Sequence, residues 1–173
     1  MKTNRILTLA LFLLLTPPVS RAALFDAILI IDGINGESTD PARRGDLQVL
    51  SYSFGATQTG IASTPTPTAT GRVNVHDIVV TKHVDKTSAK LLEACASGKH
   101  FNHAVLTVSR GNGKGSVEII KISMEDVIIS SYQTGGDSGN SLPTDRLSLN
   151  FGKVKVDYAE GSVELSVGDA PES

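Results

Sequence analysis

Apolar side chains recur at every second position through most of this sequence, which is the period of β-strands that bury one face. Seven segments carry the pattern: residues 25–31, 46–54, 73–80, 104–108, 117–124, 127–131 and 147–158. The first is an almost continuous apolar run and predicts a strand covered on both faces. The second places Leu50, Tyr52 and Phe54 on one face, and Leu47 and Val49 on the other. The pattern as a whole predicts an all-β domain.

The strand predicted over residues 147–158 changes phase part-way along. Its apolar residues stand at odd positions up to Phe151 and at even positions from Val154 onwards. A bulge or a sharp bend at Gly152 would keep a single buried face through this change. Bends of this kind are common where a sheet curls into a barrel.

Two glycine-rich or proline-rich segments predict turns and loops between the strands. Gly111-Asn112-Gly113-Lys114-Gly115 joins the fourth and fifth strands, and its glycines accept the positive φ angles of a tight hairpin. Residues 57–71 contain Pro65 and Pro67 among threonine, serine and glycine, a composition that predicts a long exposed loop without ladder or helix. Residues after Gly168 are predicted to be a frayed tail.

One segment, Ser88 to Ser97, predicts a helix. Ser88 is the expected N-cap, and Gly98 stands where a C-terminal cap is expected. Three apolar residues fall at helical spacing: Leu91, Leu92 and Cys95. We therefore interpret Cys95 as a small core residue and not as a reactive thiol, because no neighbouring His or Lys is fixed by the sequence to lower its pKa.

The first 22 residues have the three-part layout of a signal peptide. Lys2 and Arg5 precede an apolar run from Ile6 to Leu15, and the Ser20-Arg21-Ala22 triplet supplies small side chains at the positions that a signal peptidase inspects. The run is about half the ~20 residues that a spanning helix needs. We expect cleavage after Ala22 or Ala23, and a secreted or periplasmic protein. An uncleaved anchor or a buried helix is the alternative.

Removal of residues 1–22 takes away three positive charges and no acids, so the formal net charge falls from -2 to -5. No cluster of Lys and Arg interleaved with aromatics remains, which makes nucleic acid an unexpected partner. No second apolar span remains either, so we expect no membrane partner after cleavage. Cys95 is the only cysteine, which excludes an intramolecular disulfide. The expected organisation is a signal peptide (1–22), one domain (23–168) and a flexible tail (169–173).

Three short motifs suggest chemistry, and each is incomplete. Gly136-Asp137-Ser138-Gly139 has the letters around the nucleophile of chymotrypsin-like proteases, but nothing marks a histidine base or a buried aspartate upstream. Gly113-Lys114 lacks the Ser or Thr and the helix of a phosphate loop. His100 and His103 could share a metal on a helix, yet Gly98 ends the helix before them, so we expect surface loop histidines. We assign no catalytic, cofactor-binding or metal residues, and no cofactor.

Four segments taken together resemble the haemolysin-coregulated proteins (Hcp), the tube family of type VI secretion. Ile31-Asp32-Gly33-Ile34-Asn35-Gly36-Glu37-Ser38, followed by Asp40, looks like the family's first strand and Gly-Glu-Ser turn. Residues 47–58 look like its second strand, and residues 73–98 are similar to its third strand, its Asp-Lys-x-Ser helix start and its single helix. Residues 147–158 resemble its closing strand. The match covers about residues 25–160 in the family's order.

This resemblance implies a β-barrel of two curled antiparallel sheets with one flanking helix. It also implies homo-hexameric rings that stack into a tube, with spike protein, sheath and effector cargo as partners. The family's extended loop corresponds to residues 57–71, which implies a role in ring stacking. Tube proteins normally lack a signal peptide, so the leader is a departure from the family pattern.

Three functions remain as hypotheses. The first is a ring-forming tube protein, and the second is a periplasmic or extracellular binding module that keeps the barrel without the ring. The third is an enzyme with Ser138 as nucleophile, which the missing base disfavours.

The signal peptide can be tested directly. Mass spectrometry of the protein recovered from the periplasm is expected to show a chain that begins at Ala23 or Leu24, because the small residues before these positions suit a signal peptidase. Recovery of a chain that retains Met1 would contradict the prediction.

Overall fold

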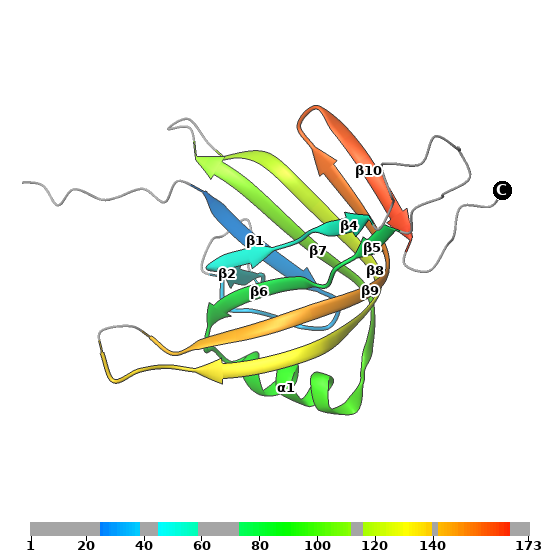
Figure 1. Cartoon of the computed structure of the whole chain (residues 1–173). Helices are drawn as coiled ribbons and strands as arrows, with labels where there is room; N and C mark the ends of the chain where they lie inside the picture. Colours follow the sequence, from blue (N-terminus) through cyan, green and yellow to red (C-terminus); the bar gives the residue numbers. More distant parts are fainter. Residues whose placement is uncertain (1–24, 39–44, 59–72, 112–115, 140–141, 167–173) are drawn as a thin grey trace, which may run out of the picture.

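The computed structural model describes residues 25–38, 45–58, 73–111, 116–139 and 142–166. In this part of the chain, an eight-stranded antiparallel sheet curls into a nearly closed barrel, and one helix packs beside it (Figure 1). The sheet comprises β1 (Asp26–Ile31), β2 (Leu47–Val49), β3 (Ser51–Ser53), β6 (Ile78–His83), β7 (His100–Gly111), β8 (Ser116–Gly135), β9 (Thr144–Tyr158) and β10 (Gly161–Ser166). Seven of these strands run in the order β2-β1-β7-β8-β9-β6-β3, and β10 pairs with β9. The predicted all-β barrel with one helix is confirmed.

The barrel closes through a single extended segment. β2 and β3 lie at the two ends of the strand order, yet only Leu50 separates them in the sequence. β2 pairs with β1, whereas β3 pairs with β6, and the backbone N–H of Leu50 donates to the carbonyl of Thr81 at 2.7 Å. The same piece of chain therefore joins both ends of the sheet, which removes most of the exposed strand edge.

The segment 46–54 was predicted as one strand, and the structure corrects this. Leu50 is an exposed bend, so the buried residues Leu47 and Val49 and the partly buried Tyr52 all face the interior, although their positions differ in parity. The bend at Leu50 turns both halves of the segment toward the core, which simple alternation could not show.

A line of bends crosses three neighbouring strands. On each strand the buried side chains switch between odd-numbered and even-numbered positions, and two residues that are not buried lie at the switch. The buried residues on either side of it are Phe101 and Ala104 on β7, Met124 and Val127 on β8, and Phe151 and Val154 on β9. At the centre, Asp126 has a left-handed backbone with φ of 52° and lies opposite Gly152. The bend predicted at Gly152 is confirmed. It is not a bulge, because the register of β8 with β9 shifts elsewhere, between Ile129 and Ser131.

Several predicted strand boundaries were wrong. Residues 117–124 and 127–131 belong to one continuous strand, β8, which passes through the bend at Asp126. Residues 73–80 are divided at His76 and Asp77 into β5 (Val73–Val75) and β6. β5 pairs with β4 (Ala56–Gln58) as a separate two-stranded ribbon, so Thr57 and Gln58 belong to a ladder and not to a loop. β10 was not predicted.

The core contains aliphatic side chains from the barrel strands, and the helix closes one side of it. Ala27, Ile28, Leu29 and Ile31 of β1 are buried, but Ile30 is exposed, so this strand is covered on both faces only in part. Burial of each large aliphatic side chain contributes roughly 1.5–3 kcal/mol, and this packing is the main source of stability in a chain without a disulfide.

The helix α1 (Ser88–Ser97) has the predicted bounds and the predicted C-cap. Gly98 is left-handed with φ of 62°, and its backbone N–H donates to the carbonyl of Cys95. The N-cap residue is Thr87 and not Ser88. The side chain of Ser88 instead takes part in a buried network of hydrogen bonds. Leu91 is buried and Cys95 packs against the core in a half-buried position, whereas Leu92 is exposed, contrary to the helical pattern.

Other predictions fall partly outside the described residues. Gly111 pairs with Ser116, so β7 and β8 form the expected hairpin, while residues 112–115 of its turn lie outside the described part. The signal peptide, residues 59–71 of the predicted loop, and the tail lie outside it too.

Gly36 offers a test of how tightly the first turn packs against the barrel. A Cβ at Gly36 would overlap the carbonyl of Asp46, and the N–H of Gly36 already donates to the carbonyl of Gly45 at 2.6 Å. We expect Gly36→Ala to lower the free energy of unfolding by about 1–3 kcal/mol or more, measured by urea denaturation, because backbone must move. Gly55→Ala is the matched control, since its Cβ meets nothing within 4 Å. Equal stabilities of the two variants would contradict the prediction.

Candidate functional site: a buried polar anchor and the surfaces around it

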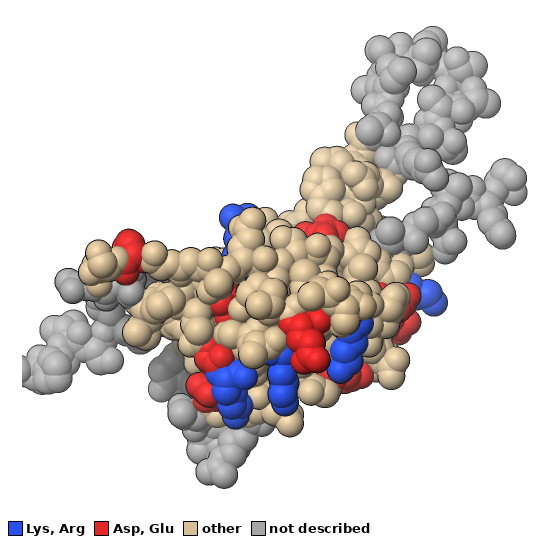
Figure 2. All heavy atoms as spheres, turned by 90° about the horizontal axis from the view of Figure 1, so that it is seen from below, with Lys and Arg blue, Asp and Glu red and all other residues tan. Residues whose placement is uncertain are grey.

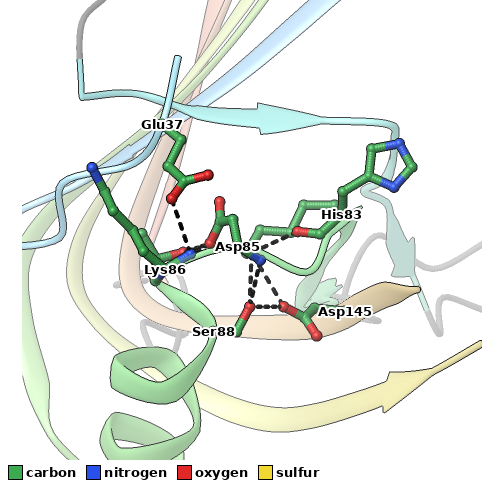
Figure 3. A network of polar contacts seen from close by, with 8 residues as sticks. Glu37, His83, Asp85, Lys86, Ser88 and Asp145 are labelled. Atoms are coloured by element: carbon green, nitrogen blue, oxygen red, sulfur yellow. Dashed lines mark hydrogen bonds and ion pairs between the residues drawn. The ribbon is translucent and has the colours of Figure 1, made fainter. Parts of the chain in front are cut away.

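A buried lysine lies where β6 meets the helix. Lys82 is in phase with Ile78 and Val80 on β6, so its side chain points inward, and it is only 1% exposed. Its ammonium donates to Oδ1 of Asp85 at 2.8 Å and to the carbonyl of His83 at 2.9 Å. It also lies 3.1 Å from Oδ2 of Asp145 on β9 (Figure 3). One ammonium thus links the end of β6, the start of the helix segment and β9.

The Asp-Lys-Thr-Ser sequence at residues 85–88 builds the other half of this network. Oδ1 of Asp85 accepts hydrogen bonds from the backbone N–H of Thr87 at 2.8 Å and from its hydroxyl at 2.5 Å. The hydroxyl of Ser88 accepts from the N–H of Asp85 at 3.0 Å and donates to Oδ2 of Asp145 at 2.5 Å. These bonds form a compact turn that starts α1 and attaches it to β9.

The Gly-Glu-Ser turn near the start of the chain adds a further contact. Oε1 of Glu37 accepts a hydrogen bond from the backbone N–H of Lys86 at 3.3 Å (Figure 3). The first turn and the helix start are therefore in direct contact, although 49 positions separate the two residues. We call the set Lys82, Asp85, Thr87, Ser88 and Asp145 the polar anchor.

Burial and hydrogen bonds act in opposite directions on the pKa of Asp145. Burial alone raises the pKa of the Asp145 carboxyl, but hydrogen bonds from Ser88, Tyr132, Lys82 and Thr134 together outweigh it, so the net pKa is lowered. Its Oδ1 has no hydrogen bond of normal geometry among the described residues, although Tyr132 and Thr134 lie close enough to influence the carboxylate. The carboxylate consequently stays charged and paired with Lys82.

The pKa values of Tyr132 and Asp85 are also shifted, by burial and by hydrogen bonds within the same cluster. Burial, followed by the hydrogen bond to Asp145, raises the pKa of Tyr132 to about 12. The pKa of Asp85 is lowered, because hydrogen bonds from Lys82 and Thr87 overcome the opposing effect of burial. The polar anchor is therefore an ion-pair cluster held charged, and this protonation state does not suit acid–base catalysis near neutral pH.

The residues that suggested chemistry in the sequence are dispersed in the structure. Ser138 is exposed in the connection between β8 and β9, where Oδ1 of Asp137 accepts the N–H of Gly139 at 2.9 Å in a turn. His100 and His103 are exposed as expected, but they lie on β7 and not in a loop. His100 pairs with Asp126 at 2.7 Å. In the described ranges, no three His, Cys, Asp or Glu side chains could together hold a metal ion.

Two pairs of strands extend from the barrel (Figure 1). β8 and β9 continue beyond it as a long hairpin, and the β4–β5 ribbon leaves from another side. The ribbon is joined to the barrel by Asp77, which accepts hydrogen bonds from Ser130 at 2.5 Å and from Asn150 at 2.8 Å.

On the face shown in Figure 2, basic and acidic side chains are interleaved, so that face presents no single sign of charge. No helix in the described ranges is long and apolar enough to cross a membrane.

A groove opens on the outer surface next to the polar anchor. It has a volume of about 790 Å³ and is lined by the start of β1, by β2 and Leu50, by Glu37 and Ser38, and by residues 83–85 before the helix. Sequence reasoning could not find it, because its walls come from four segments that only the fold brings together.

The family model for the type VI secretion system effector Hcp matches residues 29–158, which cover nearly all of the barrel just described. The chain belongs to the Hcp family. Protein hcp1 of Pseudomonas aeruginosa is 38% identical to it over 133 residues, or 77% of this chain and 82% of that protein. The family match thus spans the helix, the strands from β2 to β9 and the Gly-Glu-Ser turn.

Solved Hcp structures have the same fold. The crystal structure of Hcp1 from Salmonella typhimurium has a TM-score of 0.66 and 26% identity, covering 82% of this chain and 92% of that chain. A type VI secretion system effector from Yersinia pestis has a TM-score of 0.67 and 26% identity, covering 82% of this chain and all of that chain. The predicted resemblance is confirmed, and the chain is a type VI secretion tube protein by family.

The polar anchor predicts a stability effect with a clear sign. Lys82→Met alone should lower the free energy of unfolding by about 3–5 kcal/mol, because it leaves the buried Asp145 carboxylate without its counter-charge. Asp145→Asn alone should cost less, because Lys82 keeps its ion pair with Asp85. The double variant should cost clearly less than the sum of the two. The exposed pair Lys155–Asp157 is the control: Lys155→Met should change stability by less than about 1 kcal/mol. Additive costs in the double variant would contradict a direct pairing.

The lowered pKa values of Asp145 and Asp85 determine how the free energy of unfolding changes with pH. A carboxylate whose pKa is lowered by folding stabilises the protein above its unfolded pKa of about 4, and this contribution is lost as the pH falls through the folded value. Wild-type stability should therefore decrease below about pH 4, and Asp145→Asn should show a smaller slope there. Equal slopes would contradict a charged Asp145.

Proposed function

We propose that the processed chain is an exported Hcp subunit that forms homo-hexameric rings, which stack into a tube. The observation that supports it most is the family match from residue 29 to residue 158, which covers the helix and the strands from β2 to β9. Hexameric rings are a property of the family. By the same inference the role is structural and not catalytic, and spike protein, sheath and effector cargo are the partners.

The shape of the subunit suits ring formation. A closed ring needs head-to-tail contacts between two different patches of the subunit. The closed barrel provides a rigid body, and the exposed apolar residues Ile30, Val117, Tyr158 and Val163 provide surface that a neighbour could cover. β10, which pairs with β9 in the described sheet, offers an additional edge for lateral contact.

The leader changes where such a ring would form. We infer from residues 1–22 that the chain passes through the general export route before it assembles. Rings would then form outside the cytoplasm, so this Hcp protein serves either as a secreted relative of the tube subunit or as a component that joins the tube after export.

Sizing the processed protein tests the ring. We expect light scattering on residues 23–173 to give six times the monomer mass, and negative-stain images to show rings. A monomer with an intact fold, shown by a cooperative thermal transition, would contradict the ring and favour the alternative, an exported binding module on the same barrel.

Ring stacking can be separated from ring formation. Deletion of residues 60–69 is expected to leave the hexamer mass unchanged and to abolish stacks in negative stain, since this segment corresponds to the family's extended loop. Unaltered stacking would contradict that role.

A further inference from the structure

The turn that follows β1 contains a pair of residues that is chemically unstable in water. Asn35 is followed by Gly36, and the sequence has only one other Asn-Gly pair, Asn112-Gly113. In such a pair the backbone nitrogen of the glycine can attack Cγ of the asparagine, because glycine has no side chain to hinder the approach. Asn35 is exposed and Gly36 is buried, so the pair lies at the boundary between solvent and the packed turn.

The reaction at such a pair has two steps. The glycine nitrogen loses its proton and bonds to Cγ of the asparagine, the side-chain nitrogen leaves as ammonia, and a five-membered succinimide ring results. Water then opens the ring at one of its two carbonyl groups. One opening gives aspartate, and the other gives isoaspartate, whose main chain is one carbon longer. Water is the only co-reactant, and no oxidant or reductant is needed.

The closed turn opposes the first step at Gly36. The N–H of Gly36 donates to the carbonyl of Gly45 at 2.6 Å, so the proton that must leave is the one that makes this hydrogen bond. A succinimide nitrogen carries no hydrogen, so the bond cannot exist in the intermediate. A Cβ at Gly36 would overlap the carbonyl of Asp46, which leaves the backbone little room to shift while the ring forms. The turn must therefore open before the pair can react.

We propose that Asn35 is a site of spontaneous deamidation that the closed turn suppresses, so that it reacts only while Gly36 is detached from Gly45. The reaction rate then equals the rate of the open chain multiplied by the fraction of molecules in which the turn is open. Exposure of Asn35 alone does not set this rate, because the buried hydrogen bond of its neighbour controls the attacking nitrogen.

Isoaspartate at this position prevents the turn from closing again. The additional main-chain carbon displaces Gly36, which has no room to move. The N–H of Ser38 donates to the carbonyl of Asp46 at 3.2 Å, and this bond depends on the same path of the chain. So does the contact of Glu37 with the N–H of Lys86 at 3.3 Å. The modification therefore separates the first turn from the start of α1.

The rate of deamidation tests the proposal. The folded protein and a peptide with the sequence of residues 31–38 are incubated in the same mildly alkaline buffer, and mass spectrometry with electron-transfer fragmentation counts aspartate and isoaspartate at Asn35. Trypsin separates the two Asn-Gly pairs, because Arg43 and Arg44 lie between them. We expect the folded protein to react at least about tenfold more slowly than the peptide, since the turn must open first. A smaller ratio would overturn the proposal.

A matched pair of glycine variants assigns the protection to this turn. Gly45 has φ of 94°, which an L residue adopts only with strain, so Gly45→Ala should loosen the acceptor side of the turn and raise the rate at Asn35 about threefold to tenfold. Gly55→Ala should leave the rate unchanged, because its Cβ meets nothing within 4 Å. Equal rates in the two variants would contradict the assigned role of the turn. If Gly45→Ala does not fold, the comparison of wild type with the peptide still decides.

The effect of the product on the fold is measured separately. Asn35→Asp keeps the normal main chain and should retain the wild-type midpoint of urea unfolding, because residue 35 is exposed. Protein that carries isoaspartate at this position should unfold at a lower urea concentration. Equal midpoints would contradict the loss of the turn. The outcome is independent of ring formation and of export, because any folded form of the chain serves for the measurement.

Discussion

The fold depends on one segment, residues 47–53, that is hydrogen-bonded to opposite ends of the same sheet. β2 attaches it to β1, and β3 attaches it to β6, with the exposed Leu50 between them. Without the bend at Leu50 the segment could pair with only one of these strands, and the sheet would stay open with two long edges. The bends at Asp126 and Gly152 provide the curvature that brings β1 and β6 within reach of this segment.

The polar anchor solves a related problem at the point where the helix leaves the barrel. The chain must turn sharply between β6 and α1, and buried backbone groups in a turn need partners. Asp85 and Ser88 supply them, Lys82 balances the carboxylates, and Asp145 connects the turn to β9. Because burial of charges costs several kcal/mol per ion, the cluster contributes more to defining a unique helix position than to net stability.

The sequence predicted the class of fold, the helix bounds and the bend at Gly152, because these depend on local periodicity and on glycine. It failed where tertiary pairing overrides local pattern. β8 looked like two strands because the bend at Asp126 shifts its phase, and residues 46–54 looked like one strand because alternation does not reveal which neighbour each half pairs with. Lys82 carried a usable signal, since it stands in phase with Ile78 and Val80 on an otherwise apolar face. The groove carried none, because four separate segments form it.

The long-range pairing of β1 has a consequence for how the chain behaves while it is being made. Asp26 pairs with Ser109, and β6, which can pair with β3 early, cannot pair with β9 until Thr144 to Leu149 have been synthesised. Barrels with such non-local ladders fold slowly, because loop closure must precede the contacts that stabilise it. The nascent chain therefore cannot complete the barrel until most of it has left the ribosome, so the strands made first must wait for partners made last.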